Sequence, residues 1–261
     1  MFQGHLQKKL GGCWMKYNSF INLKKDCYIS NGDSLEIIKE IDDNSVNLIL
    51  TDPPYNLGKF MNNRGTNMGK LRENHFSATD WDHLTYEDWA KKMDQFLENS
   101  ARVIMNGGSM IIFMSLMKVE SIIKLAEKHG FYYKTTGIWH KKNPIPRNMN
   151  LHFVNSTEGW IYFTYKKKTG VFNNEKKLEH DFFESGLTPG SEKRHGGHPT
   201  QKPEILIKHF IKLLSNENDV VLDPFMGSGT TGKVASEMNR KFIGIELSDK
   251  YFKMSKERIL G

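Results

Sequence analysis

Apolar residues gather in short runs along the chain, and turn residues and helical patterns separate these runs. Seven runs predict strands, and they cover residues 27–31, 46–51, 109–114, 132–139, 159–165, 220–223 and 241–246. Several are nearly continuous in apolar residues, as in Val46-Asn47-Leu48-Ile49-Leu50. Such runs are typical of strands that helices cover on both faces.

Amphipathic helical patterns lie between the predicted strands. Thr85 can cap one helix, with Asp88 three residues later in the position of a capping box. The face that this helix is expected to bury consists of Trp89, Met93, Phe96, Leu97 and Ile104. Three further helices are predicted over residues 119–130, from residue 203 onward and from residue 248 almost to the end.

Strands that alternate with helices indicate an α/β fold with a doubly wound, mainly parallel sheet of seven strands. We expect a single domain over residues 15–261, preceded by a disordered leader at residues 1–14. Residues 56–80 are rich in Asn and Gly and lack periodicity, which predicts a mobile functional loop. Residues 166–201 are polar, basic and irregular, so no strand or helix is predicted there.

The composition is that of a soluble globular protein, with 38% hydrophobic and 26% charged residues in a chain of 261. No apolar run approaches the ~18 residues that a membrane span needs, and the first residues lack the apolar core of a signal peptide. The two cysteines, Cys13 and Cys27, favour free thiols in a reducing compartment, so a cytoplasmic protein is expected.

The net charge of +7 favours an anionic partner, and its distribution is uneven. The segment from Lys141 to Lys202 holds 11 Lys or Arg against 6 Asp or Glu, an excess of +5. Most of the basic excess therefore lies in one part of the chain.

A glycine-rich turn follows the predicted strand at 220–223. Gly227, Gly229 and Gly232 satisfy the spacing G-x-G-x-x-G, and Glu246 ends the next strand, 23 residues after Asp223. Glycines let a backbone approach a ligand, and an acid after the next strand can accept hydrogen bonds from ribose hydroxyls. These two features fit a nicotinamide dinucleotide and S-adenosylmethionine equally well, because both contain an adenosine ribose.

The order of the parts separates the two cofactors. Only two predicted strands lie at or after residue 220, so the rest of the sheet must come from upstream of the glycine turn. A nicotinamide-binding fold normally begins with its glycine turn. The order therefore disfavours an NAD-dependent oxidoreductase.

Asp52-Pro53-Pro54-Tyr55 follows the strand at 46–51, at the edge where open α/β sheets bind ligands. The exocyclic amine of a base is a poor nucleophile because its lone pair is delocalised into the ring. Asp52 can accept one amine hydrogen and the Pro53 carbonyl the other, which localises the lone pair. The Pro-Pro pair stiffens this turn, and Tyr55 can stack on an extracted base.

The motifs Asp52–Tyr55 and 225–231 together resemble those of the β-type DNA amino-methyltransferases of restriction-modification systems. The order is the permuted one of that family, in which the catalytic motif precedes the cofactor turn. Other matching pieces are Asn31-Gly32-Asp33-Ser34, Asp80-Trp81-Asp82 and Gly197-His198-Pro199-Thr200-Gln201-Lys202-Pro203. The resemblance runs from about Tyr28 to Arg258, and it implies methyl transfer from S-adenosylmethionine to adenine N6 in DNA after base flipping.

The resemblance also implies roles for single residues. Asp33 would bind the cofactor's adenine amine and Glu246 its ribose, while Phe225 and the glycine turn would hold its methionine part. The full set of implied cofactor-binding residues is Asp33, Thr200, Lys202, Asp223, Phe225, Gly227, Ser228, Gly229, Thr230 and Glu246. The catalytic residues would be Asp52, Pro53, Pro54 and Tyr55. The strands that end at Thr51 and Asp223 are expected to be neighbours.

In the family, target recognition lies between the catalytic half and the motif around His198, here about residues 141–197. The residues expected to contact DNA are Lys141, Lys142, Arg147, Lys166, Lys167 and Lys168, most of them at phosphates. A cognate restriction endonuclease and a homodimer are further expectations from the family. No metal is expected, because the histidines lack ligand spacing.

Three other interpretations stay open on the sequence. The same chemistry acts on cytosine N4, on RNA bases and on protein glutamine in related enzymes, although Asp at position 52 favours adenine. An NAD-dependent oxidoreductase is the second alternative. A nucleic-acid-binding module without catalysis is the third, and it would leave Asp52 and the glycine turn without a purpose.

Overall fold

The computed structural model describes residues 8–10, 13–15, 19–56, 84–145, 153–198 and 200–261. Arg147 and the expected loop beyond Asn56 lie outside the described residues. The strands are β1 (Lys8–Leu10), β2 (Cys13–Met15), β3 (Phe20–Lys24), β4 (Cys27–Asn31), β5 (Val46–Thr51), β6 (Ile104–Met114), β7 (Phe131–Lys141), β8 (Thr157–Tyr165), β9 (Phe182–Ser185), β10 (Val220–Asp223) and β11 (Lys241–Glu246). The α-helices are α1 (Ser34–Ile37), α4 (Tyr86–Val103), α5 (Val119–Lys128), α6 (Glu204–Leu214), α7 (Thr230–Glu237) and α8 (Asp249–Leu260).

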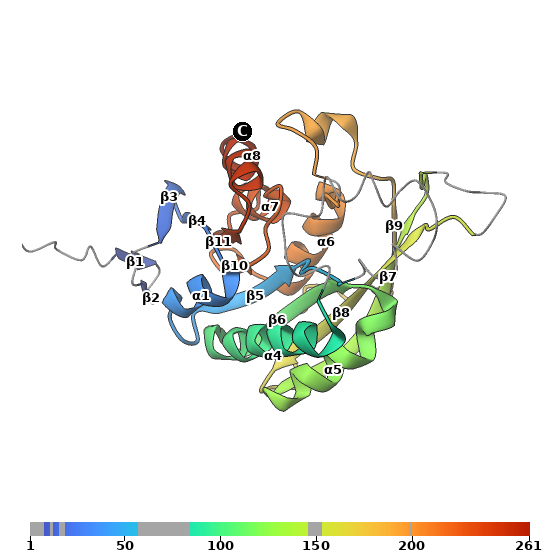
Figure 1. Ribbon diagram of the computed structural model, residues 1–261, viewed down its shortest axis with the longest axis horizontal. Coiled ribbons are helices and arrows are strands. Elements are labelled where there is room, and N and C mark those ends of the chain that lie inside the picture. Colours follow the sequence, from blue (N-terminus) through green and yellow to red (C-terminus); the bar gives the residue numbers. More distant parts are fainter. Residues whose placement is uncertain (1–7, 11–12, 16–18, 57–83, 146–152, 199) are drawn as a thin grey trace, which may run out of the picture.

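One sheet organises the molecule, with the strand order β3-β4-β11-β10-β5-β6-β8-β7-β9 (Figure 1). The five strands from β4 to β6 in this order are parallel to one another. β8 is antiparallel to both β6 and β7. The doubly wound, mainly parallel sheet is therefore confirmed, and β10 lies beside β5 as expected.

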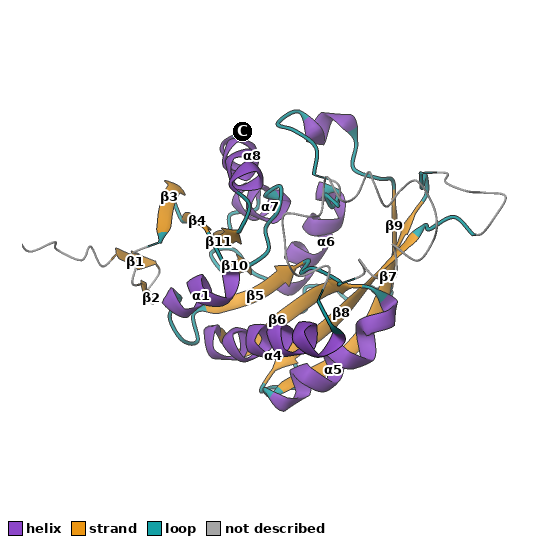
Figure 2. Ribbon diagram, viewed as in Figure 1, coloured by secondary structure: helices purple, strands orange, loops and turns teal. Residues whose placement is uncertain are grey.

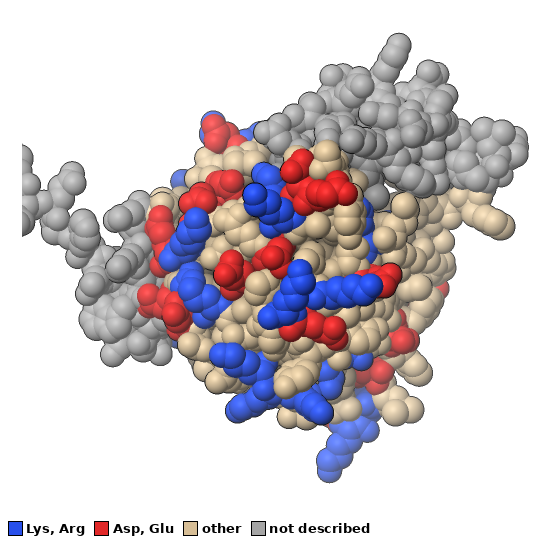
Figure 3. All heavy atoms as spheres, turned by 60° about the horizontal axis from the view of Figure 1, so that its bottom comes forward, with Lys and Arg blue, Asp and Glu red and all other residues tan. Residues whose placement is uncertain are grey.

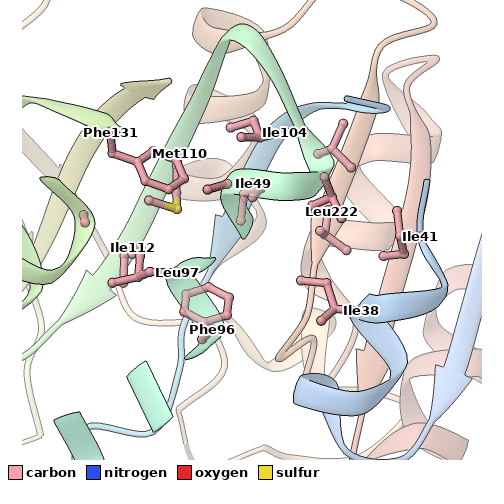
Figure 4. Close-up of a cluster of buried hydrophobic side chains, with 14 of the residues drawn as sticks. Ile38, Ile41, Ile49, Phe96, Leu97, Ile104, Met110, Ile112, Phe131 and Leu222 are labelled. Atoms are coloured by element: carbon pink, nitrogen blue, oxygen red, sulfur yellow. The ribbon is translucent and has the colours of Figure 1, made fainter. Parts of the chain in front are cut away.

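Helices cover both faces of this sheet (Figure 2). α1, α4 and α5 pack on one face through a cluster that includes Ile38, Phe96 and Leu97 (Figure 4). α6, α7 and α8 pack on the other face around Phe210, Val234 and Ile259. Burial of the central strands on both faces explains their nearly continuous apolar sequences.

The sheet has nine strands rather than the predicted seven. β3 and β9 are its two edge strands, and each buries only one residue fully, Phe20 in β3 and Ser185 in β9. Strands with so little burial need no apolar run, which is why the sequence did not predict them. β9 also corrects the expectation that residues 166–201 lack regular structure.

The long helix α4 begins as predicted, because Thr85 Oγ1 accepts a hydrogen bond from the Asp88 N–H at 3.1 Å. Trp89, Met93, Phe96 and Leu97 are buried along its inner face. Ile104 is buried too, but it opens β6 with an extended backbone rather than continuing the helix. Its assignment to the helix was wrong. The end of the helix and the start of the strand both bury an apolar residue in the same core, so the hydrophobic pattern does not mark the boundary between them.

The N-terminal segment contains regular structure where the sequence predicts disorder, since β1 and β2 pair in antiparallel register. Within the described parts of the chain, no helix is long and apolar enough to cross a bilayer.

Candidate active site

Four neighbouring parallel strands end along one edge of the sheet, and a candidate site residue lies at or just beyond each end. Glu246, at the end of β11, pairs in register with Asn31 at the end of β4. At the next two ends, the Thr51 hydroxyl of β5 donates to Asp223 Oδ1 of β10 at 2.8 Å. Ligands bind at this edge in open α/β sheets. The structure thus brings the predicted catalytic motif and the predicted cofactor turn together.

The Asp52 carboxylate is held by two donors. The Tyr55 hydroxyl donates a short hydrogen bond to Asp52 Oδ1, and Lys202 Nζ donates to Oδ2 at 2.5 Å. The Trp89 indole N–H donates to the Pro54 carbonyl at 3.2 Å, so α4 fixes the position of the Asp52–Tyr55 turn. Tyr55, expected to stack on a base, packs here against the core with its hydroxyl on Asp52.

Lys202 joins Asp52 to a second carboxylate. Its Nζ lies 3.1 Å from Glu158 Oε2, and Glu158 Oε1 accepts from Lys141 Nζ at 2.5 Å. The side chain of Lys202 is only 7% exposed, against 22% for Asp52 and 23% for Glu158. Asp52, Lys202, Glu158 and Lys141 therefore form a chain of alternating charges, which we call the charge chain.

Burial and pairing compete in setting the pKa values of the charge chain. Burial raises the pKa of Asp52, and the Lys202 ammonium opposes that rise. Burial also disfavours the charged form of Lys202, but the carboxylates of Asp52 and Glu158 outweigh it and raise the pKa of Lys202. The pKa of Glu158 is lowered despite its burial, because Lys202 and Lys141 both face it.

The glycine turn between β10 and α7 needs its glycines for backbone shape and for space. Gly227 and Gly229 have φ of 51° and 77°, in the left-handed region. A Cβ at Gly229 would lie 2.8 Å from Ser255 Cβ, and one at Gly232 would lie 2.5 Å from the Phe242 ring. The turn therefore packs α7 closely on β11 and α8.

Glu246 supports the glycine turn and keeps acceptor capacity. Its Oε2 accepts from the Gly227 N–H at 2.9 Å and its Oε1 from the Ser248 N–H at 2.8 Å. Burial raises the pKa of this carboxyl. Each carboxylate oxygen has a further lone pair, so Glu246 can also accept from two ribose hydroxyls.

Asp33 lies at the end of the neighbouring strand and is exposed. Its Oδ1 caps α1 by accepting the Leu35 N–H at 2.9 Å. Phe225 is half-buried at the start of the turn, and its ring meets Phe96 edge-on at 5.4 Å between centroids. Acceptors beside a half-buried aromatic ring and a glycine turn suit an adenosine-containing cofactor with a positively charged sulfur.

Three residues of the predicted cofactor set direct their side chains into the protein. Asp223 uses Oδ2 to accept from Thr231 Oγ1 at 2.7 Å and Oδ1 to accept from the Phe225 N–H at 3.2 Å. The hydroxyls of Ser228 and Thr230 accept from Arg258 Nη1 at 3.1 and 2.8 Å. These side chains hold the turn in place, so the three residues would face a ligand through their backbone.

The motif around His198 lies against the glycine turn. A Cβ on Gly227 would lie 3.5 Å from the His198 ring, which packs on Tyr251 at 4.2 Å between centroids. Burial, aided by Lys202 and Lys250, lowers the pKa of His198 to about 4, so the ring is neutral near pH 7. Thr200, predicted near the cofactor, is exposed beside it, with Oγ1 3.2 Å from His198 Nδ1.

The residues expected to contact DNA fall into two groups that lie at opposite edges of the sheet, because β8 runs antiparallel to β7. We call the edge where Asp52 lies the catalytic edge. β7 ends and β8 begins there, so Lys142 lies at this edge, and its side chain is 61% exposed. Lys141 also lies there, but its side chain is 12% exposed and is paired with Glu158. A phosphate contact by Lys141 is therefore not supported by the geometry.

Lys166, Lys167 and Lys168 are exposed but follow the far end of β8. β8 runs antiparallel to β6, so these lysines lie at the opposite edge of the sheet from Asp52, roughly 25 Å away at ~3.3 Å per strand residue. The structure therefore separates this cluster from the site. Figure 3 shows acidic and basic side chains interspersed over one face, so charge alone does not mark that face as a DNA-binding surface.

The sequence pointed to most of the site but not to Glu158, Trp89 or Arg258. Glu158 is an acid at the start of an otherwise apolar strand, which is the one signal that marks it. Arg258 is 3% exposed and reaches the turn from the last helix. Among the described residues, no group of three or more His, Cys, Asp and Glu is placed to hold a metal ion.

Known proteins match this chain over nearly its whole length. The sequence pattern of a family of N6 and N4 methyltransferases, described as DNA methylase, matches residues 46–257. The type II methyltransferase M2.LlaDCHI of Lactococcus lactis subsp. cremoris is 32% identical over 90% of each chain. M2.DpnII of Streptococcus pneumoniae, also a type II methyltransferase, is 31% identical over 90% of each chain.

Solved structures are also similar to this chain, among them the two that follow. The M1.HpyAVI–SAM complex has a TM-score of 0.69 and 30% identity, over 89% of this chain and 98% of that one. The cytosine-N4-specific PvuII DNA methyltransferase has a TM-score of 0.72 at 19% identity, over 90% of this chain and 86% of that one. The second likeness concerns the fold alone.

Proposed function

The chain belongs to the DNA methylase family, and on this premise we propose that it transfers a methyl group from S-adenosylmethionine to the N6 amine of adenine in DNA. The observation that carries the proposal is the position of Asp52. Its carboxylate lies at the end of β5, beside the glycine turn after β10, and is hydrogen-bonded to Tyr55 and Lys202. An anionic acceptor beside a methyl-donor site is what an exocyclic amine needs for activation.

The residues along the sheet edge fit the cofactor. Glu246 would accept hydrogen bonds from the ribose hydroxyls and Asp33 from the adenine amine, while Phe225 and Gly227 would border the methionine part. Bound there, S-adenosylmethionine supplies a methyl group on a positively charged sulfur and leaves as a neutral thioether. Asp223 would act indirectly, by holding the turn through Thr231 and the Phe225 N–H.

The catalytic motif would activate the target amine. Asp52 would accept a hydrogen bond from one amine N–H and the Pro53 carbonyl from the other. The nitrogen lone pair then localises and forms the new N–C bond. The electron pair of the broken C–S bond would stay on sulfur, and the positively charged nitrogen would then release one proton to water. Tyr55 would leave Asp52 and stack on the base. A base inside a duplex cannot reach this site, so it must be flipped out.

Further proposals follow from the family and remain separate from the chemistry. Lys142 lies at the catalytic edge and is a candidate phosphate contact, as is Arg147, which lies outside the described residues. A restriction endonuclease that cuts the same site, a homodimer and a cytoplasmic location are expected of a restriction-modification enzyme.

The proposed function is tested by identifying the methylated base. Purified protein is incubated with S-adenosylmethionine labelled in the methyl group and with unmethylated plasmid DNA, and the DNA is digested to nucleosides. Label in N6-methyl-2′-deoxyadenosine is the expected result, with none when Asp52→Ala replaces the wild type. Label in N4-methyl-2′-deoxycytidine would overturn the choice of base, and an absence of label from any DNA would overturn the proposal.

A further inference from the structure

We propose that Glu158 is a positioning residue for methyl transfer: it shares the Lys202 ammonium with Asp52 and so keeps one oxygen of Asp52 available to the target amine. This inference rests on the proposed function, because it assigns a role within the same site. Glu158 lies in β8, far in sequence from both Asp52 and the motif around His198.

Two donors already draw on the charge of Asp52. Its Oδ1 accepts from Tyr55 and its Oδ2 from Lys202, so only the second lone pair of each oxygen is left for the target amine. Tyr55 is held by its hydroxyl contact to Asp52 and by packing against the core, and on the proposed function it gives up the hydroxyl contact when a base enters and stacks on its ring. Lys202 is different, since an ammonium on a buried carboxylate is held by charge as well as by the hydrogen bond.

Glu158 is the second carboxylate on that ammonium. Lys202 Nζ lies 2.5 Å from Asp52 Oδ2 and 3.1 Å from Glu158 Oε2, with the Lys202 side chain 7% exposed. In so little solvent, each carboxylate weakens the hold of the other on the cation. Without the Glu158 charge, Lys202 would be bound to Asp52 alone and would compete more strongly with the amine.

Lys141 fixes Glu158 from the other side. Glu158 Oε1 accepts from Lys141 Nζ at 2.5 Å, and Lys141 Nζ also lies 5.0 Å from the centroid of the Trp139 ring. Lys141 is the last residue of β7, immediately before the exposed Lys142. Through Lys202 on one side and Lys141 on the other, Glu158 therefore links Asp52 to the end of β7, where the expected target-recognition segment begins.

Among the residues that the structure describes, the charged and titratable groups around Asp52 are Tyr55, Lys202, Glu158 and Asp223. Lys141 and His198 act on it through Glu158 and Lys202. Removing the negative charge of Glu158 lowers the pKa of Asp52, because that charge raises it in the intact protein. Removing the positive charge of Lys202 acts in the opposite direction.

The test compares Glu158→Gln with the wild type in turnover at saturating cofactor and unmethylated plasmid DNA, over a range of pH. We expect kcat to fall on the order of tenfold, because a stronger hold of Lys202 on Asp52 weakens the activation of the amine. We also expect the acidic limb of the kcat profile to move to lower pH. For Lys202→Met, the limb should move to higher pH.

Glu184→Gln is the matched control. Glu184 pairs with Lys142 Nζ at 3.0 Å, next to the Lys141 contact, but does not share the Lys202 ammonium. It should leave the acidic limb where it is. Melting temperature and cofactor affinity of Glu158→Gln are measured as well, since a purely structural role would lower stability without moving the limb.

The possible outcomes separate the inference from the function on which it rests. Wild-type protein that methylates no DNA contradicts the proposed function. Active wild type with a Glu158→Gln variant that has unchanged kcat and an unmoved acidic limb overturns the role of Glu158 alone. An acidic limb that moves equally in Glu184→Gln overturns it too, because the shift would then follow from the loss of any negative charge near the site.

Discussion

The Thr51 hydroxyl donates a 2.8 Å hydrogen bond to Asp223 Oδ1, and this contact joins the ends of β5 and β10. Thr51 immediately precedes Asp52, the proposed catalytic residue, while Asp223 opens the glycine turn. Thr51 and Asp223 are 172 residues apart in sequence, and their contact adds to the direct pairing of β5 with β10 in setting the relative position of the two motifs. Both groups are buried, at 2% and 5% exposure, so water does not compete for this bond.

Asp223 predicts a pH dependence of stability. Burial is the main cause that raises its pKa to about 7 from 3.8. The folded state therefore binds this proton more tightly than the unfolded state, and stability declines as the pH rises from about 4 to about 7. In Asp223→Asn this decline is removed, so the melting temperature of the variant relative to the wild type should increase from pH 5 to pH 8.

The comparison between variants cancels the buried carboxyl of Glu246, because it is present in each protein. The charge of Asp52 is one cause of the raised pKa of Asp223, so the pH dependence that the substitution removes includes this coupling. Glu217→Gln, at an exposed position before the same strand, controls for the loss of one negative charge. A melting-temperature difference that stays constant between pH 5 and pH 8 would contradict the ionisation assigned to Asp223.

Asp52→Ala should abolish methyl transfer while leaving cofactor binding largely intact. The loss of an essential electrostatic contact typically costs ~10²–10³ in rate. Glu246 and Gly227, which would hold the cofactor, have no contact with Asp52 in the described residues, although Lys202 of the predicted cofactor set is hydrogen-bonded to it. Rates come from label transfer, and cofactor binding comes from the rise in melting temperature with S-adenosylmethionine. A variant with near-normal turnover would remove Asp52 from the mechanism.

Glu246→Ala should weaken cofactor binding. One charge-assisted hydrogen bond contributes about 1.5–3 kcal/mol, so affinity should fall roughly 10- to 150-fold. S-adenosylmethionine should raise the melting temperature of the wild type, and NAD should not. Because Glu246 also holds the Gly227 and Ser248 N–H groups, Glu246→Gln tests how much of the loss comes from the turn. Glu257→Ala, an exposed acid in α8, should bind normally.

The sequence predicted the parts of this protein that depend on local pattern. The central strands could be recognised because both faces are buried, and the glycine turn because Gly227 and Gly229 need a left-handed backbone. Glu158 could not be assigned to the site, since its role depends on β8 running antiparallel beside β6, which no local pattern records. The same strand direction explains why lysines close in sequence lie at opposite edges of the sheet.

That separation of lysines changes where DNA contacts are expected. Lys142 follows the end of β7 at the catalytic edge, whereas Lys167 follows the end of β8 at the opposite edge. Both side chains belong to the basic segment from Lys141 to Lys202, and both are exposed. They are therefore matched in charge and in solvent exposure, and they differ in position.

Lys142→Ala should weaken DNA binding, and Lys167→Ala should not. A lysine at a phosphate releases counterions on binding, so its loss should reduce the slope of log affinity against log salt by about one unit. The loss should be the same for cognate and non-cognate DNA, because phosphates carry no sequence information. Binding is measured by fluorescence anisotropy on labelled duplexes across a salt series.

Lys142 also pairs with Glu184 at 3.0 Å, so Glu184→Gln should strengthen DNA binding slightly by releasing the Lys142 ammonium. Equal slopes for Lys142→Ala and the wild type would remove Lys142 from the DNA contacts, and a reduced slope for Lys167→Ala alone would place the DNA at the other edge of the sheet.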